Sequence, residues 1–156
     1  MVMQTSRSPW LDRLFRLANL AIIPGWLLMI GAPRSRWTQR VINDDRFFIG
    51  MGGLYAAMLG GALVENEGNG FSFSSMLNPT LDSIGKLFQE GGPKGTFAGW
   101  THYLVFDFFV GRAILRDAQE KQIPHWLVVP ALLCTLMSGP LGLAYYQVLL
   151  RLRGAA

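Results

Sequence analysis

Phe47 to Val64 reads FFIGMGGLYAAMLGGALV and holds no charged side chain over eighteen residues. An α-helix needs about 20 mostly apolar residues to cross the hydrocarbon core of a bilayer, and about 17 is the lower limit. Small residues recur along this stretch at helical spacing: Gly50, Gly53, Ala57, Gly60 and Gly61. Membrane helices associate by close packing, so such a stripe lets a second helix approach. The stretch therefore predicts a transmembrane helix with one packing face.

In the rest of the chain, too, apolar and charged residues are segregated into separate stretches. Hydrophobic residues make up 51% of the 156 residues and charged residues 15%, and the charges are excluded from several long stretches. The net charge of +4 comes from basic residues that mostly flank apolar runs, as at the ends of membrane spans. No basic patch alternates with aromatic residues, so we predict no nucleic-acid partner. The single cysteine, Cys134, cannot form an intramolecular disulfide.

Three further stretches are candidates for membrane spans: residues 14–32 with Pro24, residues 96–115, and residues 124–150 with Pro130 and Ser138-Gly139-Pro140. Neighbouring helices can satisfy a carbonyl that a proline frees, and the Ser-Gly-Pro sequence should kink or locally unwind the last span. We predict an all-α polytopic membrane protein, a four-helix transmembrane bundle formed by a single domain over residues 1–156. The lipid bilayer is its first predicted partner.

The polar stretch 65–95 contains one short amphipathic segment. Asn78 and Pro79 are typical of the N-cap and first position of a helix, and Gly91-Gly92 is typical of its end. Its apolar side chains repeat at helical spacing: Leu77, Leu81, Ile84 and Phe88. We predict a helix over residues 79–90, too short to span, that lies in the plane of the membrane interface. A loop helix packed on the bundle is the alternative.

The basic residues do not predict an orientation. If all four spans cross the membrane, seven Lys and Arg residues fall on each side, so the positive-inside rule does not favour either orientation. The first apolar run lacks a signal-peptide cleavage site, which predicts a retained span. We expect a multi-pass protein of a bacterial inner or photosynthetic membrane, or of a plastid membrane if the chain is processed from a plant precursor.

The third stretch carries ionisable residues that lipid alone would not tolerate. Asp107 lies near its middle, where inserting a carboxylate costs about 2.5–3.5 kcal/mol. Such residues usually face the interior of a bundle, find a partner and mark a functional site. Tyr103 lies one turn before Asp107 and is placed to donate a hydrogen bond to it. His102 and Arg112 are each turned about 140° away, so the three converge only if this helix is central.

Each of these residues also has a structural interpretation. Asp107 and His102 could serve only to fix helix packing, and Arg112 is typical of an end residue that extends to the interface. A haem held by His102 and His125 is disfavoured, because the helix separates their levels by roughly 21 Å. No Cys or His spacing is typical of a metal site, and we predict neither a metal nor a cofactor.

With these residues in view, the stretch 99–112, GWTHYLVFDFFVGR, resembles the signature of the neoxanthin-synthase-like family. Its plant members are plastid membrane proteins linked to abscisic-acid deficiency. Residues 139–142 (GPLG) and 85–88 (GKLF) fit the same family, as do several residues around the first span: Asn19, Pro24, Trp26 and Pro33. The resemblance covers roughly residues 14–150.

This resemblance implies a role in carotenoid metabolism. Plant members are associated with converting violaxanthin to neoxanthin, an isomerisation that opens a 5,6-epoxide and leaves an allene. That reaction needs an acid at the epoxide oxygen and a base for a carbon-bound proton. By motif match, His102 and Asp107 are the candidate catalytic residues, with Arg112 as electrostatic support. The candidate ligand-binding residues are Trp100, Tyr103, Phe106 and Pro140.

Two functions remain open at this point. The first is a carotenoid isomerase, or a component of one, that acts on a carotenoid or another lipid-soluble terpenoid. The second is a non-catalytic pigment- or lipid-binding protein or an accessory subunit of a membrane complex. For the second function, the glycine-rich stretch would supply the face for a homo-oligomer or another membrane partner. Asp107→Asn distinguishes them, because only the enzyme should lose its function.

Overall fold

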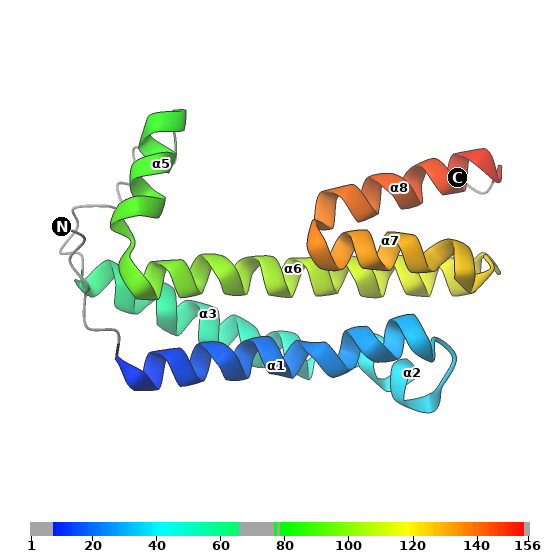
Figure 1. Cartoon of the computed structure of the whole chain (residues 1–156), viewed down its shortest axis with the longest axis horizontal. Coiled ribbons are helices and arrows are strands. Elements are labelled where there is room, and N and C mark those ends of the chain that lie inside the picture. The colour runs from blue at the N-terminus through cyan, green and yellow to red at the C-terminus, as the bar shows by residue number, and fades with distance from the viewer. Residues whose placement is uncertain (1–7, 66–76, 78, 155–156) are drawn as a thin grey trace.

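The computed structural model describes residues 8–65, 77 and 79–154. These residues form seven helices and no strand, which confirms the all-α class. In chain order the helices are α1 (Pro9–Gly31), α2 (Arg36–Asn43), α3 (Arg46–Glu65), α5 (Leu81–Glu90), α6 (Gly92–Glu120), α7 (His125–Met137) and α8 (Gly139–Leu152) (Figure 1).

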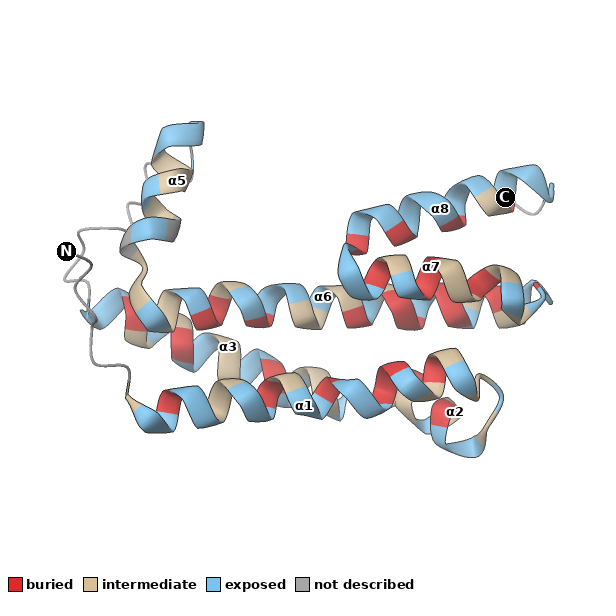
Figure 2. Cartoon of the chain, in the orientation of Figure 1, coloured by how far each residue is buried: buried red, intermediate tan, exposed pale blue. Residues whose placement is uncertain are grey.

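α6 is the central helix of the molecule. It has 29 residues, which gives a length of about 43 Å. α1 and α3 run along one side of α6, and α7 and α8 lie on the other (Figure 1). The larger buried cluster joins α6 to α1 and α7 through side chains such as Trp26, Phe108 and Leu132. Figure 2 shows the buried positions on the faces that these helices turn toward one another.

α1 and α6 are held close by two reciprocal contacts between a glycine and an aromatic ring. The Phe108 ring lies beside Gly25, with its nearest carbon 2.5 Å from the place where a Cβ on Gly25 would sit. The Trp26 ring lies in the same way beside Gly111. The Trp26 and Phe108 rings meet edge to face, with their centroids 5.7 Å apart. Each glycine therefore makes room for a ring of the other helix, as small residues do where membrane helices pack.

Among the glycines of the α3 stripe, only Gly61 approaches another helix closely, since a Cβ there would lie 3.0 Å from Cδ of Lys94 in α6. A Cβ added at Gly50, Gly53 or Gly60 would meet no atom within 4 Å. α3 instead has three buried residues: Met51, Met58 and Ala62. The closest glycine contacts among the described helices are thus those of α1, α6 and α8, whereas the α3 stripe as a face for a partner chain stays a prediction.

The segment predicted as the fourth span is not one helix. The chain reverses at Ser138, between α7 and α8, and α8 returns alongside α7 (Figure 1). The Tyr146 hydroxyl of α8 donates a 2.7 Å hydrogen bond to Asp117 near the end of α6. The end of α8 therefore lies beside the point where α7 begins. The prediction of a single kinked span over 124–150 was wrong in this respect.

The local sequence explains why the chain reverses and does not merely bend. Ser138 is extended, with φ −166° and ψ 80°, and interrupts the helix. Pro140 lies in the first turn of α8, where its missing N–H costs no helical hydrogen bond. A Cβ on Gly142 would overlap backbone atoms of Thr135 and Ala131, so only glycine lets α8 lie against α7 there.

α5 begins two residues later than predicted. Its N-cap is Thr80, whose hydroxyl accepts a 3.1 Å hydrogen bond from the Ser83 N–H. The Ser83 hydroxyl accepts a 3.0 Å hydrogen bond from the Thr80 N–H, which completes a capping box. The predicted N-cap, Asn78, lies outside the described residues. α5 ends at Glu90 as predicted and points away from the other helices (Figure 1), while its interfacial location stays a prediction.

Two of the described helices, α1 and α3, are long and apolar enough to cross a bilayer. Only 22% of the most apolar part of α1 and 17% of that of α3 is buried, so their apolar side chains mostly face outward. An apolar helix in the core of a water-soluble protein would be mostly buried. α6 is long enough but too polar to satisfy the same test, and α7 is apolar but short.

Candidate functional site

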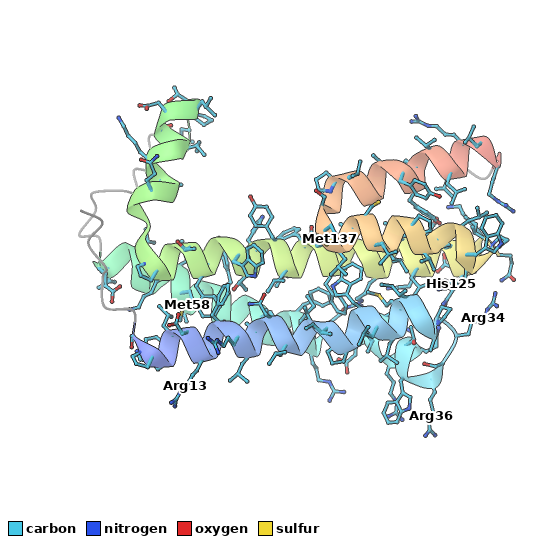
Figure 3. The ribbon with its side chains drawn as sticks, viewed as in Figure 1. Arg13, Arg34, Arg36, Met58, His125 and Met137 are labelled. Atoms are coloured by element: carbon cyan, nitrogen blue, oxygen red, sulfur yellow. The ribbon has the colours of Figure 1, made fainter. Side chains whose placement is uncertain are left out.

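Asp107 lies where the tip of the α7–α8 hairpin meets α6. The backbone N–H of Gly139, the first residue of α8, donates a hydrogen bond to the Asp107 carboxylate. A Cβ on Gly139 would overlap that carboxylate, so the contact requires glycine. The N-terminus of α8 carries a partial positive charge that stabilises a carboxylate beside it. Figure 3 shows Met137, the last residue of α7, at this tip, partway along α6.

His102 lies on the exposed side of α6 among aromatic rings. Its ring centroid is 4.5 Å from that of Phe106, and the Tyr103 and Tyr55 rings are each 6.1 Å away. Tyr103 and Phe106 are both 56% exposed. His102 is near enough to Asp107 for its protonated form to attract the carboxylate. His102 and Asp107 thus lie within about one and a half turns of each other on α6, but their side chains leave the helix about 140° apart.

The hydrogen bond predicted between Tyr103 and Asp107 is not formed. Within the part of the chain that the structure describes, Tyr103 contacts the His102 ring edge to face, and Asp107 is bonded to Gly139 instead. The helical spacing of Tyr103 and Asp107 was correct, but it could not show that α8 would begin beside the carboxylate.

Two predicted ligand-binding residues lie on either side of this region. The Trp100 indole N–H donates a 2.8 Å hydrogen bond to Asn19 of α1, which links α6 to α1. About half of the Trp100 side chain, 48%, remains exposed. Pro140 is exposed in the first turn of α8, directly after Gly139. Trp100 thus has a structural contact, whereas Pro140 lies at the hairpin tip itself.

Arg112 is 4% exposed and is directed toward the junction of α2 and α3. Its guanidinium donates hydrogen bonds of 2.7 and 3.1 Å to the Ile42 carbonyl and one of 3.2 Å to the Asp44 carbonyl. It also forms a 3.1 Å ion pair with Asp45 and lies 4.6 Å from the centroid of the Phe48 ring.

These contacts give Arg112 a structural role. The last carbonyls of a helix have no partner within the helix, and Arg112 satisfies those at the end of α2. The interpretation as an end residue that extends outward was wrong, because the side chain is buried. Its role as electrostatic support for Asp107 stays a prediction, and its polar contacts among the described residues are all to the α2–α3 junction.

Sequence reasoning missed a second polar contact on α6. One Asp117 oxygen accepts the Tyr146 hydroxyl at 2.7 Å, and the other pairs with Lys121 at 2.6 Å. Burial raises the pKa of Asp117, but the hydrogen bonds from Lys121 and Tyr146 outweigh it and hold the pKa below its usual value. The i,i+4 spacing of Asp117 and Lys121 and a tyrosine in an apolar segment were the available signals.

The chemistry within reach of the site is proton transfer. Among the residues that the structure describes, no three His, Cys, Asp or Glu side chains are grouped closely enough to hold a metal ion. A carboxylate and an imidazole can exchange protons with a ligand, and the exposed rings of Tyr103 and Phe106 offer flat apolar surface.

The fold and the site together define an all-α protein with outward-facing apolar helices packed on a central helix that carries the polar residues. The chain belongs to the ABA DEFICIENT 4-like family, whose sequence profile matches residues 13–146, and this confirms the resemblance seen in residues 99–112. It is also 28% identical over 124 residues to the protein ABA DEFICIENT 4, chloroplastic, of Arabidopsis thaliana. That match covers 75% of this chain and 55% of the relative, so the chain spans about half the length of the plant protein. No solved structure matches the chain.

Proposed function

We propose that the chain is an integral membrane protein that acts on a carotenoid, as an isomerase of epoxy-xanthophylls or a component of one. The family to which the chain belongs supports a carotenoid as the substrate. The resemblance of residues 99–112 to plant members of that family implies this class of substrate. The observation that carries the proposal is the Asp107 carboxylate, held against the start of α8 beside exposed aromatic rings.

In the proposed arrangement, α1, α3 and α6 cross the bilayer. The outward-facing apolar side chains of α1 and α3 support their crossing, and α6 shares their direction (Figure 1). The α7–α8 hairpin enters and leaves on one side and ends near Asp107. Non-helical backbone is tolerated at membrane depth where protein surrounds it, which suits a break packed on α6. The membrane is that of a bacterium or a plastid.

His102 and Asp107 have separate roles in the proposed reaction. Protonated His102 gives a proton to the epoxide oxygen as one carbon–oxygen bond breaks, and the Asp107 carboxylate removes a proton from the neighbouring carbon as the allene forms. One proton enters the substrate and one leaves, so the product is an isomer and no oxidant or reductant is consumed. Tyr103 and Phe106 contact the conjugated chain in this arrangement.

The test is pigment analysis in a host that accumulates violaxanthin. Expression of the full chain should convert part of this pigment to an isomer, and Asp107→Asn should abolish the conversion while inserting into membranes in equal amount. Asp12→Asn, which changes an exposed carboxylate on α1, is the matched control and should retain activity. An unchanged pigment profile with inserted wild-type protein, or full activity of Asp107→Asn, would contradict the proposal.

A non-catalytic pigment-binding role is the second candidate. The exposure of about half of each ring among Trp100, Tyr103, Phe106 and Phe109 favours it, because such a surface can hold a polyene without chemistry. Co-purification of one carotenoid with both the wild-type chain and Asp107→Asn, with no conversion by either, would support this candidate against the enzyme.

A further inference from the structure

A second feature lies away from Asp107, at the corner between α1 and α2. An apolar slot of about 270 Å³ opens there. Its α1 side is formed by Ala21, Pro24, Gly25 and Leu28, and its other walls by Val41, Phe47 and Phe108. The four α1 residues share one helical face and cover about 10 Å of the helix. The slot therefore extends along α1, in the direction that an acyl chain takes in a bilayer.

The slot is continuous with a polar hollow. Both are lined by Arg40 and Asp44, and the hollow is completed by residues around the end of α2: Gln39, Asn43, Asp45 and Arg46. An apolar slot joined to a polar hollow fits a ligand that is apolar along one part and polar at one end.

The carboxylates of the hollow already have basic partners. Asp44 pairs with Arg46 at 2.7 Å, and Asp45 pairs with Arg112 at 3.1 Å. Hydrogen bonds from Arg46 hold the pKa of Asp44 at about 2, so this pair stays ionised at neutral pH. Neither carboxylate is therefore left to neutralise a further arginine.

The surplus charges of the corner are Arg40, which lines both the slot and the hollow, and Arg36, which lies one turn before Arg40 on α2 and outside both linings. Both are exposed, and among the described residues neither lies within ion-pair distance of a carboxylate. Their guanidinium carbons each lie 5.1 Å from the centroid of the Trp37 ring. Trp37 is 51% exposed, and tryptophan beside arginine is typical of the membrane–water interface. The corner thus presents two positive charges at the depth of lipid headgroups.

We propose that this corner binds one anionic phospholipid, with an acyl chain in the slot and the phosphate at Arg36 and Arg40. Guanidinium groups match the geometry of phosphate oxygens, and the two unpaired charges favour an anionic headgroup over a zwitterionic one. The proposal depends on the membrane embedding proposed above and not on the carotenoid chemistry.

The test measures which lipid the purified full chain retains from nanodiscs that contain equal amounts of phosphatidylglycerol and phosphatidylcholine. Native mass spectrometry should show one retained phosphatidylglycerol. Arg36→Gln/Arg40→Gln should weaken this retention about 30-fold, the loss expected for two basic contacts at a membrane surface. Ala21→Trp, which fills the slot without changing a charge, should abolish retention of both lipids. Inorganic phosphate should not displace the lipid.

The matched control is Arg151→Gln/Arg153→Gln, which removes two exposed arginines of the α8 end and should leave retention unchanged. An equal loss in this control, or retention that survives Ala21→Trp, would overturn the proposal. Displacement by inorganic phosphate would show a site for free anions and would also overturn it. A chain that stays soluble without detergent would contradict the membrane proposal itself, whereas equal retention of both lipids contradicts the lipid site alone.

Discussion

Gly139 has no side chain, and the Asp107 carboxylate occupies the space that a Cβ would take. The same residue donates its backbone N–H to that carboxylate. At the scale of single residues, this contact holds the tip of the α7–α8 hairpin against α6 and orients the Asp107 carboxylate, which is the candidate base. A substitution at Gly139 therefore acts on stability and on the site together.

Gly139→Ala should lower the free energy of unfolding by about 1–3 kcal/mol, because the new methyl group overlaps the carboxylate. The cost should shrink in an Asp107→Ala background, where the overlap is removed. Thermal unfolding in detergent measures both. Gly53→Ala is the control, since a Cβ there meets no atom within 4 Å. An equal cost with and without Asp107 would show that the contact is not the cause.

Arg112 is the second residue on which the packing depends. Arg112→Gln should lower the free energy of unfolding by about 1–3 kcal/mol, because the buried Ile42 carbonyl loses its hydrogen-bond donor. Arg116→Gln, which changes an exposed arginine one turn later, should be near neutral. If the two substitutions cost the same in thermal unfolding, Arg112 does not hold the α2–α3 junction.

At the scale of elements, the hairpin is tied to α6 by Asp117 and Tyr146. Because the pKa of Asp117 in the folded state is lowered from 3.8, its ionised form stabilises the fold above about pH 4, and this stabilisation is lost as pH falls through the lowered pKa. Tyr146→Phe removes one cause of the shift and should make thermal unfolding less sensitive to pH below about 4. An unchanged acid response would show that the contact does not hold α8.

The sequence could predict the elements that depend on local composition. Charge-free runs and their flanking residues indicated α1 and α3, and the Gly91-Gly92 pair indicated the end of α5. Ser138-Gly139-Pro140 predicted a break in the last span, but not a full reversal, because the reversal also depends on the packing of Gly142 against Thr135 and Ala131. The partner of Asp107 followed from that reversal and was missed with it.

At the scale of the whole molecule, the reversal also changes the charge balance between the two ends. Figure 3 shows Arg13 at one end of the bundle and Arg34, Arg36 and His125 at the other. The hairpin brings Arg151 and Arg153 to the second end. Among the described residues, four Lys and Arg residues then lie at the first end and nine at the second. The numbers of basic residues at the two ends are then no longer equal. For the proposed arrangement with three crossings in a bacterial membrane, the positive-inside rule predicts that the second end faces the cytoplasm.

Single-cysteine labelling in intact membranes tests the three crossings and the hairpin most directly. In a Cys134→Ala background, cysteines that replace Arg34, Lys86 and Arg153 are exposed to a reagent that cannot cross the bilayer. The expected result is that positions 34 and 153 react from the same side and position 86 from the other. Reaction of positions 86 and 153 from one side, opposite to position 34, would show a fourth crossing and contradict the hairpin that holds Gly139 against Asp107.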